Sequence, residues 1–159
     1  MVLRAILAVS FGGAMLASTS AYADWEYTEW GMSPEQVAAA AERAGSPIDE
    51  VTNPQPTPTG AVNLLTSRHE AAGHHFDVKF LFENNRLSLV SLLAHTPERC
   101  PELRRSIIQV YGEPESQDGI FGANTYRWRH REGGSMIELI DMDGSACALS
   151  YRRSRIDGL

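Results

Sequence analysis

The clearest pattern in the chain is an alternation of apolar and polar residues between residues 74 and 95. Successive side chains of a strand point to opposite faces, so this alternation predicts strands with one buried face. Asn84-Asn85 interrupts it, and both residues tolerate the positive φ of a type I′ turn. We therefore expect a hairpin in which Glu83 pairs with Arg86. That register places these side chains on one apolar face: Phe76, Val78, Phe80, Phe82, Leu87, Leu89, Ser91 and Leu93.

The segment before this hairpin predicts a helix and one more strand. Ser33 suits the N-cap, Pro34 the first helical position, and Gln36 completes a capping box. Gly45 followed by Pro47 predicts the end of the helix. A third strand is expected over residues 61–70, after a proline-spaced connector.

The same punctuation recurs in the second half of the chain. Thr96-Pro97-Glu98 predicts a helix start and Gly112-Glu113-Pro114 its end. An apolar stripe lies between them, formed by Cys100, Leu103, Ile107 and Val110. Strands are expected over 124–131, 135–142 and 145–152, joined at Gly133-Gly134 and Asp143-Gly144. The predicted fold is α+β, with two tandem α-β-β-β units (24–95 and 96–159) that have antiparallel sheets and one helix packed on each.

This layout resembles the β-lactamase inhibitor protein fold, and a single unit resembles the small subunit of the outer-membrane barrel-assembly machinery. The resemblance is one of topology, based on the [ST]-P-E helix starts, the G-x-P stops and the hairpin turns. It implies a binding or assembly role, because members of that structural group mostly present a sheet face to another protein. No inhibitory motif matches by position, so no functional residue is carried over.

The first 23 residues have the three zones of a secretory signal peptide. Arg4 precedes an apolar core over residues 5–16, and Ala21-Tyr22-Ala23 has the small-x-small form of a cleavage site. No later segment has the roughly 20 apolar residues of a membrane span. We therefore expect a periplasmic or secreted protein with no transmembrane segment after cleavage.

The net charge excludes one class of partner, and the cysteine content agrees with export. The chain has 14 basic and 20 acidic residues and a formal net charge of −6, which does not attract nucleic acid. Two cysteines, Cys100 and Cys147, predict a structural disulfide in an oxidising compartment. A catalytic thiol is the alternative, but no Cys/His signature accompanies either residue.

The stretch RHEAAGHH, residues 68–75, begins like a zinc-protease signature. That signature needs a second histidine four residues after the first, where this chain has Gly73. We instead expect a hairpin with the loop Ala71-Ala72-Gly73, in which His69 lies opposite His75. This pair could share a metal, but two ligands make a weak site. No metal site and no cofactor are predicted, and a metal-dependent hydrolase using the 69–75 histidines is kept as an alternative.

The segment from Asn124 to Arg131 is the leading candidate for a binding surface. Alternation puts Tyr126, Trp128 and His130 on one face, and Tyr and Trp are common at binding hot spots. The expected Asp143-Gly144 register places Cys147 on the opposite face, so the disulfide would hold the second helix there. The alternative is that the helix covers the aromatic face and Trp128 is core.

The sequence thus predicts an exported, non-catalytic binding or assembly protein. Its partner would be a protein or an envelope component bound through a sheet face. A carrier of a small apolar ligand is a further alternative.

Overall fold

The computed structural model describes residues 25–130 and 134–154. The proposed signal peptide, residues 1–23, and its cleavage site lie outside these residues. The described chain has two α-helices, α1 (Pro34–Arg43) and α2 (Cys100–Tyr111), and a short 3-10 helix, η1 (Pro97–Arg99). Its strands are β1 (Ile48–Glu50), β2 (Val62–Ala71), β3 (His74–Glu83), β4 (Arg86–Ala94), β5 (Ser116–Ile120), β6 (Ala123–His130), β7 (Ser135–Asp141) and β8 (Cys147–Arg153).

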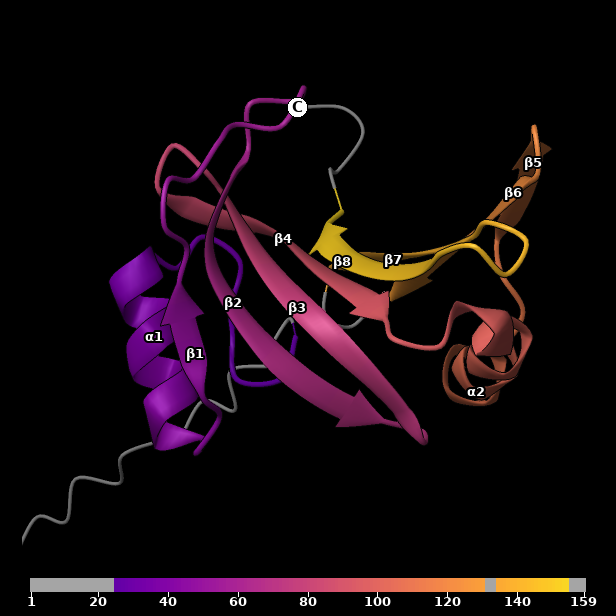
Figure 1. Cartoon of the computed structure of the whole chain (residues 1–159), viewed down its shortest axis with the longest axis horizontal. Helices are drawn as coiled ribbons and strands as arrows, with labels where there is room; N and C mark the ends of the chain where they lie inside the picture. Colours follow the sequence, from indigo (N-terminus) through magenta and orange to yellow (C-terminus); the bar gives the residue numbers. More distant parts are fainter. Residues whose placement is uncertain (1–24, 131–133, 155–159) are drawn as a thin grey trace, which may run out of the picture.

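All of these strands belong to one antiparallel sheet (Figure 1), whereas one sheet for each half of the chain was expected. The order is β1-β2-β3-β4-β8-β7-β6-β5, and the pairing of β4 with β8 joins the two halves. Edge strands β1 and β5 were not predicted. β1 has only three residues, and every residue of β5 is exposed, so neither carries the alternation by which a strand is recognised.

The hairpin of β3 and β4 confirms the predicted turn but not the whole predicted face. Asn84 and Asn85 have φ values of 50° and 61°, and Glu83 pairs with Arg86. A β-bulge at Ser88 then shifts the register by one residue. Such a shift turns every later side chain to the other face. The buried residues of β4 are consequently Leu87, Val90, Leu92 and Ala94, and the predicted inward positions of Leu89, Ser91 and Leu93 were wrong.

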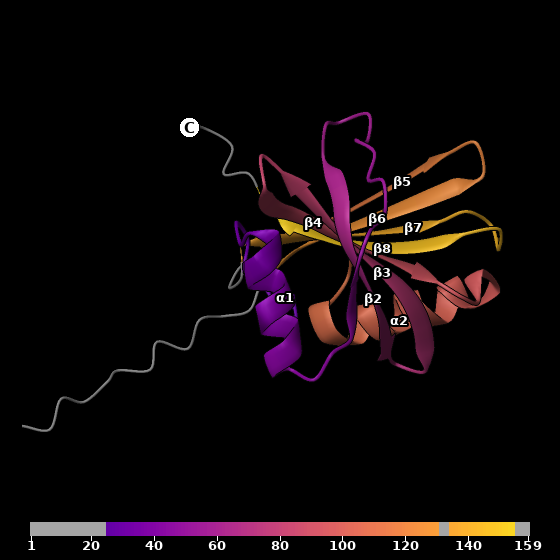
Figure 2. The ribbon, with the colours of Figure 1, turned by 60° about the vertical axis from the view of Figure 1, so that its left-hand side comes forward.

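Both helices lie on the same face of the sheet (Figure 2), and their buried residues belong to one core. The capping box of α1 is present, because the Ser33 amide donates to Gln36 Oε1 at 2.8 Å and the Gln36 amide to Ser33 Oγ. The start of α2 differs from the prediction. Thr96 makes no side-chain cap, and η1 precedes the α-helix.

The predicted disulfide between Cys100 and Cys147 is confirmed, with a Cα–Cα distance of 5.6 Å. It ties the first residue of α2 to the first residue of β8. A disulfide within the chain indicates a non-reducing, extracytoplasmic environment.

Candidate functional site

Two of the three residues predicted to form an aromatic binding surface are part of the core. Tyr126 is 4% and Trp128 3% exposed. The register of β7 and β8 explains the error: Asp141 pairs with Cys147, and this puts Cys147 on the same face as Leu139. The disulfide therefore holds α2 over the aromatic face, the alternative in which Trp128 is core.

Local contacts fix these aromatic side chains. Trp128 Nε1 donates to the carbonyl oxygen of Gly112, which follows α2, at 2.8 Å. Arg104 of α2 lies over the Tyr126 ring, 4.7 Å from its centroid, and donates to the Tyr126 hydroxyl. His130 remains partly exposed, with its ring 5.6 Å from that of Tyr111.

The RHEAAGHH segment is a hairpin, as expected, but its register differs from the predicted one. Ala72 and Gly73 form a two-residue turn with φ values of 50° and 73°, so Glu70 pairs with His75 and His69 with Phe76. His69 and His75 consequently point to opposite faces of the sheet. Within residues 25–130 and 134–154, no group of three or more His, Cys, Asp or Glu side chains is placed to hold a metal. The expected pairing of His69 with His75 was wrong.

His74 is the buried histidine of this hairpin and predicts a pH dependence of stability. It is 2% exposed, and burial, followed by the charge of Arg99, lowers the pKa of its imidazole. As the pH falls below about 6.5, the ordinary imidazole pKa, His74 becomes protonated in the unfolded chain. In the folded protein the lowered pKa keeps the imidazole neutral to a lower pH. The free energy of unfolding therefore decreases from pH 8 to pH 5.

Urea unfolding at the two pH values checks this expectation. His74→Gln should lose less stability between pH 8 and pH 5 than the wild type does. His75→Gln, at an exposed position next in sequence, should keep the wild-type loss. Equal pH dependence in the wild type and His74→Gln would contradict the assignment.

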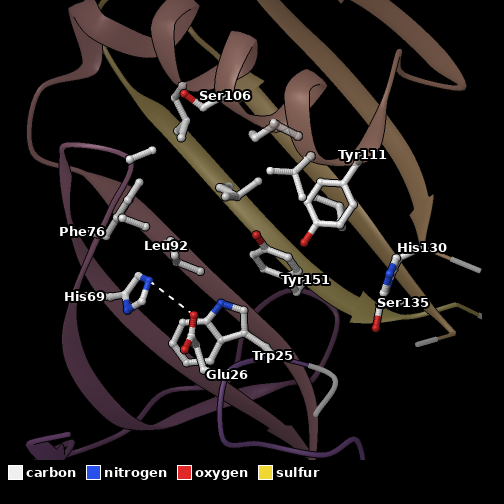
Figure 3. Close-up of a pocket in the computed structure, with 17 residues that line it drawn as sticks. Trp25, Glu26, His69, Phe76, Leu92, Ser106, Tyr111, His130, Ser135 and Tyr151 are labelled. Atoms are coloured by element: carbon white, nitrogen blue, oxygen red, sulfur yellow. Dashed lines mark ion pairs between the residues drawn. The ribbon is translucent and has the colours of Figure 1, made fainter. Parts of the chain in front are cut away.

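A cleft of about 290 Å³ lies on the helix-covered face of the described chain. It lies between α2 and the segment that precedes α1, above the centre of the sheet (Figure 3). Its apolar lining comes from both halves of the chain and includes Phe76, Leu92, Leu103, Ile107, Ile137 and Leu149. Val110, which is 73% exposed, also lines the cleft, so the predicted apolar stripe of α2 ends at the cleft and not in the core.

Trp25 and Glu26 form one end of the cleft. The Trp25 ring is 6% exposed and packs edge-on against Phe80 and His69, with ring centroids 5.6 and 5.5 Å apart. Glu26 Oε1 lies 3.7 Å from His69 Nε2, and its side chain is 51% exposed. Glu26 has a φ of 48°, and Thr28 holds the tight turn by donating from its hydroxyl to the Trp25 carbonyl oxygen at 2.7 Å.

A pair of tyrosines forms the opposite wall. Tyr111, the last residue of α2, and Tyr151 of β8 point their hydroxyls toward one another (Figure 3). Burial raises the pKa of the Tyr151 hydroxyl, and Tyr111 and then Glu26 raise it further. The Tyr151 hydroxyl is therefore neutral at physiological pH and acts in hydrogen bonding.

Ser135 and His130 form the far end of the cleft, where β6 and β7 meet. Ser135 is 2% exposed and accepts a hydrogen bond from Trp30 Nε1 at 3.0 Å. Of the three residues predicted as a binding surface, only His130 lines the cleft. Glu26 and the tyrosine pair were missed, because they come from segments far apart in sequence and share no spacing motif.

Among the described residues, no helix has the length and apolar character needed to cross a bilayer. Comparison of the chain with models of protein families, with curated proteins and with solved structures found no match.

Proposed function

We propose that this chain is an exported, non-catalytic binding protein whose ligand is a small molecule with an apolar body, held in the cleft beside α2. The observation that carries the proposal is a concave, mostly apolar cleft of about 290 Å³ with a few polar groups at its margin. Ligand sites in proteins are typically clefts of roughly 300 Å³ and above with this composition. Tyr126 and Trp128, the leading residues for a protein-binding face, are buried and do not compete with the cleft as a binding surface.

The polar groups of the cleft support binding over catalysis. Glu26 lies beside His69, and Ser135 accepts from Trp30. The side chains of Tyr111 and Tyr151 form a hydrogen bond. These pairs fix the shape of the walls, and a preformed wall is what a binding site needs to hold a ligand with little ordering cost.

The location of the ligand would be the periplasm or the extracellular medium. The disulfide supports an extracytoplasmic site for the protein, and the leader-like residues 1–23 support export. A small apolar envelope component is thus the partner class that we favour.

We also infer that the chain consists of two tandem units. Each half contributes one α-helix followed by four antiparallel strands. The last strands of the two halves, β4 and β8, lie side by side, and the first strands, β1 and β5, form the two edges. The cleft would then form between the units, with Trp25 and His69 from the first and Tyr111 and Tyr151 from the second.

Filling the cleft should abolish binding of a neutral apolar probe. Ser106 lies on α2 and lines the cleft, so Ser106→Trp places a large side chain in the space the ligand needs. We expect its affinity for N-phenyl-1-naphthylamine, measured by probe fluorescence, to fall by about tenfold or more, the loss of roughly 1.4 kcal/mol of binding free energy.

Gln109→Trp is the matched control, because Gln109 is an exposed residue of the same helix that is not part of the cleft lining. It should bind the probe as the wild type does. Failure of the wild type to bind the probe, or unchanged binding by Ser106→Trp, would argue against the cleft as the site.

A further inference from the structure

We propose that the ligand of the cleft carries a positive charge, and that it is an amine or quaternary ammonium compound with an apolar chain. This inference rests on the proposed function and names the chemical class of its ligand. It follows from the signs of the charges around the cleft and from the aromatic rings that face it.

The cleft has a carboxylate and no basic side chain of the lysine or arginine type among its described lining residues. Glu26 supplies the carboxylate, and its Oε1 lies 3.7 Å from Nε2 of the His69 imidazole. A cation in the cleft would meet the Glu26 carboxylate, whose neighbour in the cleft is the His69 imidazole. An anion would meet no compensating charge and would lose its hydration.

Arg104 of α2 and Arg99 of η1 have other partners. Arg104 donates to the Tyr126 hydroxyl. Arg99 bonds with Glu102 Oε2 at 2.6 Å and with the Gly73 carbonyl oxygen at 3.1 Å. These guanidinium groups are held by their own contacts and do not neutralise Glu26.

Aromatic rings complete the cation site. Trp25 lies beside Glu26, and Tyr151 and Tyr111 line the cleft farther along, as Figure 3 shows. Ring faces attract ammonium groups, and the combination of aromatic rings with one carboxylate is typical of sites for quaternary ammonium ligands. The pKa of the Tyr151 hydroxyl is raised first by burial, then by Tyr111 and then by Glu26, which agrees with Glu26 and the tyrosines lining one cleft.

The apolar lining accounts for the rest of the ligand. Phe76, Leu92 and Leu149 lie on the sheet beneath the cleft, and Leu103 and Ile107 line it from α2. An alkyl chain on this surface leaves its charged head at the half-exposed Glu26 side chain. The apolar lining then holds the alkyl chain, and the Glu26 carboxylate holds the charged head.

Three chain-matched compounds test the inference at pH 8: octyltrimethylammonium, octanol and octyl sulfate. Each is titrated against protein loaded with N-phenyl-1-naphthylamine, and probe displacement is measured. We expect octyltrimethylammonium to displace the probe at a concentration about fivefold lower than octanol, the effect of one half-exposed ion pair. Octyl sulfate should be the weakest.

Glu26→Gln removes the charge with little change of shape and should abolish the preference for the ammonium compound while leaving octanol unchanged. Glu29→Gln, at an exposed glutamate of the same segment outside the cleft lining, should keep the preference. Equal displacement by octanol and octyltrimethylammonium, or an unchanged preference in Glu26→Gln, would overturn the cationic ligand and leave the binding function standing. Absence of probe binding by the wild type would overturn both.

Discussion

Replacing Trp128 with alanine should lower the free energy of unfolding by about 3–5 kcal/mol, the usual cost of removing a large buried aromatic side chain. Trp128 is 3% exposed, and its Nε1 donates to the carbonyl oxygen of Gly112 at the end of α2. The substitution therefore leaves a cavity beneath α2 and removes the bond that holds the helix end. Urea unfolding followed by circular dichroism measures the loss.

Phe121→Ala is the matched control for this substitution. Phe121 is a fully exposed aromatic residue at the tip of the β5–β6 hairpin, and its removal should change the unfolding free energy by no more than about 0.5 kcal/mol. An unfolding curve of Trp128→Ala that matches the wild type would mean that the aromatic face is a surface and would reverse the assignment of α2 to that face.

Breaking the Cys100–Cys147 disulfide should cost about 4 kcal/mol of unfolding free energy by the chain-entropy model, because the bond closes a loop of 47 residues. The Cys100→Ala/Cys147→Ala double variant should unfold at a lower urea concentration than the oxidised wild type. Reductant should destabilise the wild type by a similar amount and leave the double variant unchanged.

The disulfide has a consequence for the cleft as well. Because Cys100 anchors the start of α2 and Leu103, Ser106 and Ile107 of the same helix line the cleft, loss of the bond should weaken probe binding even where the protein remains folded. Probe affinity that is equal in the oxidised and reduced proteins would show that α2 is held in place without the disulfide.

Local signals predicted most elements of the fold. The capping box at Ser33 and Gln36 is a contact within one turn of chain, and it is present as predicted. The Asn84-Asn85 turn depends on the φ values that these two residues tolerate, and it is also present. Such features depend on neighbours in sequence, which is why a single sequence reveals them.

Strand register was the part that local patterns could not determine. A two-residue turn at Ala72-Gly73 in place of a three-residue loop moved His69 away from His75. A bulge in β4 reversed the faces of Leu92 and Leu93, and the β7–β8 register moved Cys147 to the aromatic face. In each case the change is one residue, and because side chains alternate with a period of two, it exchanges inside for outside.

The cleft could not be predicted from the sequence for a related reason. Its walls come from the segment before α1, from β2, from α2 and from β8, and they meet only because β4 pairs with β8. No spacing between Glu26 and Tyr151 could indicate that they line one site.

The most direct test of the central claim is to locate a bound ligand on the protein by NMR. Titration of octyltrimethylammonium into isotope-labelled protein should shift the resonances of Trp25, Leu92, Ile107 and Tyr151, which line the cleft. Resonances of the opposite face, such as those of Lys79 and Ser150, should stay in place. Shifts confined to that opposite face would contradict the assignment of the cleft as the binding site.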